Sequence, residues 1–69
     1  MIRTYLCRDM IRGERRLTAA TLRTLWSGTW EVTNIITVEI RPGYVETLTV
    51  GGHYGGEHPT MPPWLRALK

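Results

Sequence analysis

The sequence predicts an α+β domain. Its small antiparallel sheet, built in the order strand, helix, strand, strand, carries one helix on a face and is followed by an irregular C-terminal tail. Three observations predict this fold: apolar and polar residues alternate from Trp30 to Ile40, a helix start signal lies at Thr18, and a Pro-Gly pair at 42–43 separates two strand-like runs. We expect residues 1–50 to form a compact β-α-β-β core and residues 51–69 to form the tail of the same domain.

The segment from Ile2 to Ile11 is predicted to form the first strand. Its large apolar residues fall on both faces of the pleat, with Tyr5, Cys7 and Ile11 on one face and Ile2, Leu6 and Met10 on the other. A strand that is apolar on both faces is usually central in its sheet or covered on both sides. Gly13 and Glu14 are expected to end the strand in a turn.

The predicted helix begins after Thr18, a residue type whose side chain accepts hydrogen bonds from the first free amides of a helix. Leu17 before this cap and Leu22 beyond it have the spacing of a hydrophobic staple. The helix is so short that packing must hold it, through an apolar stripe formed by Leu22, Leu25 and Trp26. Gly28 is expected to end the helix in a left-handed conformation.

The last two strands are predicted to form a hairpin. The first strand of this hairpin, from Trp30 to Ile40, directs five apolar residues to one face: Trp30, Val32, Ile36, Val38 and Ile40. Pro42 and Gly43 then stand in the order of a type II turn, and the returning strand runs from Tyr44 to Val50. A two-residue loop would direct Thr47 and Thr49 to the core. An odd-length loop would direct Leu48 and Val50 there, and we expect this second arrangement, with a bulge, because it buries more apolar surface.

The tail combines glycine-rich and proline-rich stretches. Four glycines lie between residues 51 and 56, and Pro63 suits the first turn of a short helix through Leu68. Two interpretations of Trp64 and Leu65 are open. They either fold back to complete a core that contains no Phe, or Trp64 belongs with His53, Tyr54 and Met61 to an exposed interface. The two are compatible if Trp64 is the anchor and Tyr54 is exposed.

Composition is that of a small globular protein, with 42% hydrophobic and 22% charged residues among 69. A chain this short buries only about 60% of the surface of its unfolded form. We therefore expect no large enclosed active site, and we expect oligomerisation to add stability. The single cysteine and the absence of a signal-like or membrane-spanning apolar run indicate a cytoplasmic protein without membrane contact.

Few residues are suited to catalysis or to holding a cofactor. His53 and His58, with Cys7 or Glu57, are the only conceivable metal ligands, but they match no recognised ligand spacing, so we expect solvated loop histidines and no metal site. Cys7 has no evident base nearby and is interpreted as an inert buried thiol. The glycines from 51 to 56 lack the Lys-Ser/Thr of a phosphate-binding loop. The sequence therefore predicts a non-enzymatic protein without a cofactor.

Positive charge is concentrated in the first third of the chain. Residues 1–23 hold six arginines and two acidic residues, a net charge of +4, whereas residues 24–69 hold three basic and four acidic residues, a net charge of −1. The planar arginine fork suits phosphate and carboxylate groups, although genomic base composition produces the same bias. The candidate binding residues form a ridge around the predicted strand-to-helix corner: Arg8, Arg12, Arg15, Arg16 and Arg23.

These features favour a binding or regulatory role, of the kind common among accessory and inhibitor proteins of bacteria, phages and mobile elements. We expect a protein partner that contacts the arginine ridge and an apolar anchor at Tyr54 or Trp64. The alternative is a nucleic-acid-binding protein that places the same arginines on a phosphate backbone, with the helix N-terminus adding donors.

Overall fold

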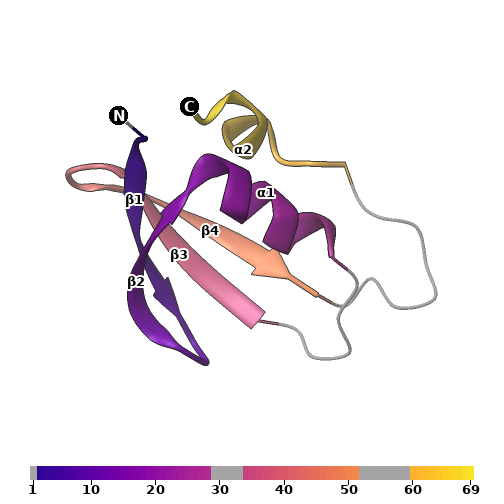
Figure 1. The fold of residues 1–69 in the computed structure, drawn as a ribbon, viewed down its shortest axis with the longest axis horizontal. Coiled ribbons are helices and arrows are strands. Elements are labelled where there is room, and N and C mark those ends of the chain that lie inside the picture. The colour runs from indigo at the N-terminus through magenta and orange to yellow at the C-terminus, as the bar shows by residue number, and fades with distance from the viewer. Residues whose placement is uncertain (1, 29–33, 52–59) are drawn as a thin grey trace.

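The computed structural model describes residues 2–28, 34–51 and 60–69. Its elements follow in the order β1 (Thr4–Asp9), β2 (Gly13–Thr18), α1 (Ala19–Ser27), β3 (Asn34–Arg41), β4 (Tyr44–Val50) and α2 (Pro63–Ala67). The four strands form one antiparallel sheet in the spatial order β2-β1-β3-β4, so that β2 and β4 are its edges (Figure 1). The α+β class is confirmed. The predicted order strand, helix, strand, strand is wrong because a further strand precedes the helix.

The unpredicted strand is β2, which turns back along β1 as a hairpin. Asp9 pairs with Gly13, and residues 10–12 form the loop. Gly13 has a φ of 81°, the left-handed geometry that closes a three-residue hairpin loop. The segment lacks the sequence pattern of a strand because Leu17 is its only fully buried residue. Arg15 and Arg16, expected at the entry of the helix, therefore lie in a strand.

The first strand is central, as expected, but shorter than predicted and covered on one face. It lies between β2 and β3, and its buried apolar residues are Tyr5 and Cys7. Ile2, Met10 and Ile11 lie outside the strand and are exposed. The continuous strand from Ile2 to Ile11 is wrong because the chain turns at Met10 and not at Gly13.

Helix α1 begins where the sequence predicts. Thr18 is its N-cap, and the Thr18 hydroxyl oxygen accepts a hydrogen bond from the Thr21 N–H at 3.2 Å. The predicted left-handed cap at Gly28 is wrong, since this residue has a φ of −69°. The Gly28 N–H nevertheless satisfies one terminal carbonyl, because it donates to Thr24 O at 3.1 Å.

The β3–β4 hairpin has the predicted core face but a different loop. Its buried residues are Ile36, Val38, Leu48 and Val50, as expected, and Ile40 is partly buried. Trp30 and Val32 lie outside the described residues. The loop contains only Pro42 and Gly43, and Gly43 has the positive φ of 80° that a type II turn requires. The extra residue is Ile40, which bulges from β3 where the register shifts. A bulge within the strand thus produces the apolar register that an odd-length loop was expected to give.

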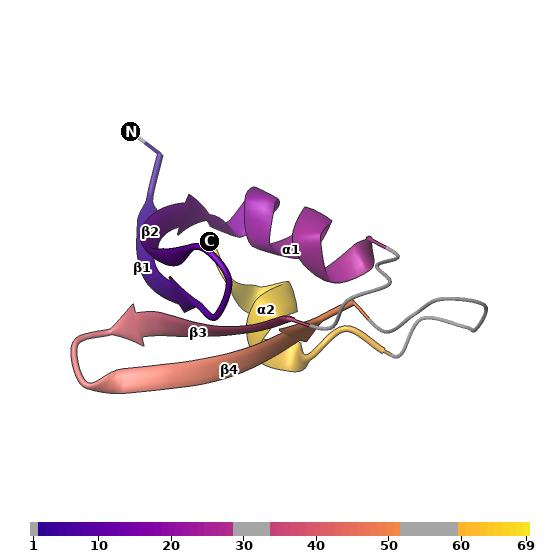
Figure 2. The same cartoon turned by 90° about the horizontal axis from the view of Figure 1, so that it is seen from below.

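One hydrophobic cluster contains buried residues from all four strands and from both helical regions. Leu22 and Trp26 of α1 belong to it, as do Leu65 and Leu68, and Trp64 packs against it partly buried. Figure 2 shows α1 running alongside the β3–β4 hairpin. The interpretation in which Trp64 and Leu65 complete the core is confirmed, while Tyr54 lies outside the described residues.

Replacing Leu22 by Ala should lower the free energy of unfolding by about 2–5 kcal/mol, because the truncated side chain leaves a cavity. Leu22 has no exposed surface. Thr24→Ala, on the exposed side of the same helix, should change the free energy of unfolding by less than about 1 kcal/mol. Urea denaturation followed by tryptophan fluorescence measures both. Equal losses for the two variants would contradict the assigned buried face of α1.

Candidate functional site

The five arginines of the predicted ridge do not share one surface. Leu6 of β1 pairs with Arg16 of β2, and Arg8 with Glu14. All four side chains therefore lie on the sheet face opposite the hydrophobic cluster, which we call the outer face. Arg12 is exposed in the hairpin loop. The structure thus brings Arg8, Arg12 and Arg16 together on the β1–β2 hairpin. Arg15 lies on the inner face of the same hairpin and Arg23 on α1, and both make internal contacts.

Arg15 is held by an ion pair on the inner side of the sheet. Its Nη2 donates to Asp9 Oδ2 at 3.0 Å, and the Asp9 side chain is only 1% exposed. Burial of a carboxylate costs free energy through desolvation, and the Arg15 guanidinium offsets this cost for Asp9. This arginine stabilises the domain through its contact with Asp9.

The Asp9 carboxylate connects the hairpin loop to two neighbouring strands. Its Oδ1 accepts hydrogen bonds from the backbone N–H groups of Ile11, at 2.7 Å, and Arg12, at 3.1 Å. The same oxygen accepts from Asn34 Nδ2 in β3 at 2.8 Å. With the Arg15 bond, one side chain fixes the position of the loop relative to β2 and β3.

Ionisation of Asp9 is favoured by this arrangement. Burial raises the pKa of Asp9, but the hydrogen bonds from Asn34, from the Ile11 and Arg12 amides and from Arg15 outweigh burial and lower the pKa from 3.8 to about 2. The carboxylate is therefore charged throughout the neutral range, and the donors that orient the loop keep their acceptor.

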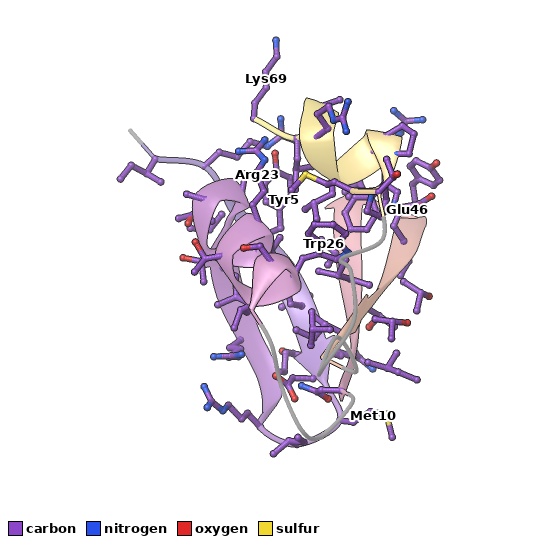
Figure 3. The ribbon with its side chains drawn as sticks, turned by 90° about the vertical axis from the view of Figure 1, so that its right-hand side faces the viewer. Tyr5, Met10, Arg23, Trp26, Glu46 and Lys69 are labelled. Atoms are coloured by element: carbon purple, nitrogen blue, oxygen red, sulfur yellow. The ribbon has the colours of Figure 1, made fainter. Side chains whose placement is uncertain are left out.

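The loop held by Asp9 exposes two large apolar side chains. We call Met10, Ile11 and Arg12 the hairpin tip; Met10 is 75% exposed and Ile11 65% exposed. The Met10 N–H also donates to Ile35 O of β3 at 3.3 Å. Figure 3 shows Met10 at the opposite end of the view from Lys69, with its side chain directed away from the ribbon. The tip therefore presents apolar surface from a backbone that is fixed at several points.

Sequence reasoning missed the tip because it placed Met10 and Ile11 in a strand. The signal that could have revealed the tip is Asp9 followed, four positions later, by Gly13. An aspartate at this position can accept from the backbone amides of the next residues, and a glycine can close the loop with a positive φ.

Arg23 connects the two helices. Its Nε donates to Leu65 O at 3.1 Å, and its Nη2 donates to Arg66 O at 3.3 Å and to Leu68 O. These carbonyls belong to the last turn of α2 and to Leu68, its C-cap, at the helix end that favours a cation. Arg23 therefore holds α2 against α1, the region where Figure 3 places it.

The reactive groups of the described residues do not form a metal-binding cluster. Cys7 is fully buried, its Sγ–H donates to Tyr5 O at 3.3 Å, and burial raises the pKa of its thiol. Residues 2–28, 34–51 and 60–69 contain no group of three His, Cys, Asp or Glu side chains that could hold a metal ion. His53, Glu57 and His58 lie outside these ranges.

Comparison of the chain with protein-family models, with curated proteins and with solved structures found no match. In the part of the chain that the structure describes, neither helix has the length and apolar character needed to cross a bilayer.

The Asp9 network makes stability depend on pH. Because the pKa of Asp9 is lower in the folded state, its contribution is present above about pH 4 and is lost as the pH falls toward 2. Asp9→Asn should lower the free energy of unfolding at pH 7 by about 1.5–3 kcal/mol and flatten its decrease in acid. Glu14→Gln, at an exposed carboxylate, should keep the wild-type slope. Urea denaturation at a series of pH values from 7 to 2 measures the free energy of unfolding of each variant. If the free energy of Asp9→Asn falls with pH as steeply as that of the wild type, Asp9 is not the source of the pH dependence.

Loss of the Arg23 guanidinium should loosen α2. Arg23→Met keeps the aliphatic stem but removes three hydrogen bonds, two to carbonyls of α2 and one to Leu68 O, and we expect it to lower the free energy of unfolding by about 1–3 kcal/mol. Arg16→Met, at an exposed arginine of β2, should change it by less than about 0.5 kcal/mol. Hydrogen exchange should show faster exchange of the Leu65 and Arg66 amides in Arg23→Met alone.

Proposed function

We propose that this chain is a small non-enzymatic binding protein that attaches to an acidic surface of a protein partner through the hairpin tip. The observation that carries the proposal is the exposure of Met10 and Ile11, side by side, on a loop that a buried carboxylate holds in place. Exposed apolar side chains are ordinary when scattered, but adjacent ones on a rigid protrusion favour a recognition element.

Charge around the tip supports an acidic partner. Arg12 belongs to the tip, and Arg8 and Arg16 lie on the outer face of the two strands that lead to it. Arg8 Nε lies 3.4 Å from Glu14 Oε2, but these side chains are 75% and 56% exposed. Their ion pair is therefore weak, and a carboxylate of the partner can replace Glu14. Arginines beside an apolar anchor steer the encounter and fix orientation.

Rigidity of the tip supports tight rather than adaptive binding. The loop amides of Ile11 and Arg12 are already satisfied by Asp9, so binding does not need to order this backbone. Regulation by occlusion of a partner's surface requires only this kind of attachment. The proposal includes action in the cytoplasm, with which a single, buried, reduced Cys7 is compatible.

Direct binding of DNA or RNA is the second candidate, and it is favoured by three exposed arginines on one hairpin. Contacts with phosphate would need Arg8, Arg12 and Arg16 but would not need Met10 or Ile11. The two candidates therefore depend on different side chains of the same element.

Ile11→Ser should weaken binding of a protein partner by more than about fivefold, because truncation of an interface anchor costs upwards of 1 kcal/mol. Tyr44→Ser, at an exposed aromatic in another strand, is the matched control and should bind as the wild type does. Proteins captured by the wild type and by Tyr44→Ser, but not by Ile11→Ser, are identified by mass spectrometry. Calorimetry with the purified candidate then gives the dissociation constants.

Nucleic acid is tested with the same variants. Anisotropy measurements with labelled duplex DNA and single-stranded RNA at low salt should show no saturable binding. Binding that falls steeply with salt, is lost in a variant with Arg8, Arg12 and Arg16 changed to Gln, and survives Ile11→Ser would replace the proposed function with the second candidate.

A further inference from the structure

The two edges of the sheet differ in how they are protected against pairing. The β2 edge is six residues long and carries three charged side chains in succession, at Glu14, Arg15 and Arg16. The β4 edge is seven residues long, and Glu46 is its only charged residue. Charged side chains, prolines and bulges are the usual devices that keep an edge strand from pairing with another chain. Of these protective features, the β4 edge has only the single carboxylate of Glu46.

The backbone of β4 is regular and has one strand neighbour. Within residues 2–28, 34–51 and 60–69, strand pairing joins β4 to β3 alone, and no further backbone hydrogen bond reaches β4. The bulge of this hairpin is at Ile40 in β3, so it does not distort the outer edge. Tyr44, Val45, Thr47 and Thr49 are exposed along the strand.

We propose that two copies of this chain pair through β4 in an antiparallel arrangement centred on Thr47. The two-fold axis stands perpendicular to the sheet, so both hydrophobic cores lie on the same side of one continuous eight-stranded sheet. Thr47 then faces Thr47 of the second copy, Val45 faces Thr49, and Tyr44 faces Val50. Thr–Thr pairs and pairs of an aromatic with a β-branched residue are among the favourable cross-strand combinations.

The register follows from the residues of β4. Side-chain alternation allows only registers that differ by two residues, which moves the two-fold axis by one residue along β4. A register shift of one residue would direct the apolar face outward. A shift that centres the axis on Glu46 places two carboxylates directly opposite each other, which is destabilising. A shift that centres it on Leu48 leaves Tyr44 and Val45 unpaired. Centring on Thr47 pairs the whole strand and separates the two Glu46 side chains.

A second copy is favoured over an unrelated strand by size and by symmetry. A 69-residue domain gains stability from association more than a larger one does. The pairing also leaves the opposite edge of each sheet, with its β1–β2 hairpin, uncovered. The two tips then lie at opposite ends of the assembly, and the dimer presents two copies of the element that the proposed function uses.

The dimer is measured by sedimentation velocity over a concentration series of the full chain. The wild type should sediment as a dimer at micromolar concentration. Thr47→Lys should raise the dimer dissociation constant by at least about tenfold, because it places two ammonium groups opposite each other at the axis. Thr49→Lys, on the same strand and face but opposite Val45, should change it by less than about threefold. Circular dichroism confirms that both variants are folded.

A covalent test is independent of affinity. Thr47→Cys should oxidise to a disulfide-linked dimer on a non-reducing gel, because identical residues meet only at the axis. Thr49→Cys should remain monomeric on the same gel, and the native Cys7 is fully buried and does not interfere. A wild-type monomer at all concentrations overturns the proposal, as does a dimer that is unaffected by Thr47→Lys. Binding of a partner by the monomeric Thr47→Lys variant leaves the proposed function intact, so the two can fail separately.

Discussion

The structure depends on one buried charge. Asp9 ends β1, pairs with Gly13 at the start of β2, and holds Asn34 at the start of β3, so three strands meet at a single carboxylate. Each of its oxygens accepts from a donor that the fold supplies, and the Arg15 guanidinium balances its charge. Removing any donor would leave a buried charge under-compensated, which costs more than the lost hydrogen bond alone. The direction of the hairpin tip follows from this network.

Local sequence patterns predicted those elements whose signals are local. Thr18 caps α1 because a hydroxyl can satisfy an amide a few residues away, and the β3–β4 core face follows from alternating apolar residues. β2 was not predictable in this way, since four of its six residues are polar or charged. Its pairing with β1 depends on the contacts of Asp9 and not on an apolar pattern. A bulge in this hairpin was predicted, but its position was not. It lies at Ile40 in β3 because Pro42 and Gly43 form a two-residue turn.

The candidate site shows the same division between composition and geometry. Charge counting located the basic third of the chain, and three of its arginines do lie together on the hairpin. It could not reveal that Arg15 compensates Asp9 or that Arg23 holds α2, because both contacts join residues that only the fold brings together. Met10 and Ile11 were placed in the first strand for a related reason. Apolar character predicts burial only if the strand continues, and here the strand ends at Asp9 and not at Ile11.

The two hairpins of the sheet achieve their turns by different means, and the difference bears on function. Pro42 and Gly43 close the β3–β4 hairpin through their backbone preferences, and the Arg41 and Tyr44 side chains that contact each other beside them are exposed. The β1–β2 hairpin uses a buried ion pair and hydrogen bonds to its loop amides, which is a demanding way to make a turn in a domain this small. The network does more than close the loop, since it fixes the backbone from which Met10 and Ile11 project. Because the pKa of Asp9 is about 2, no titration near neutral pH releases that backbone. These properties suit a permanent recognition element better than a switch.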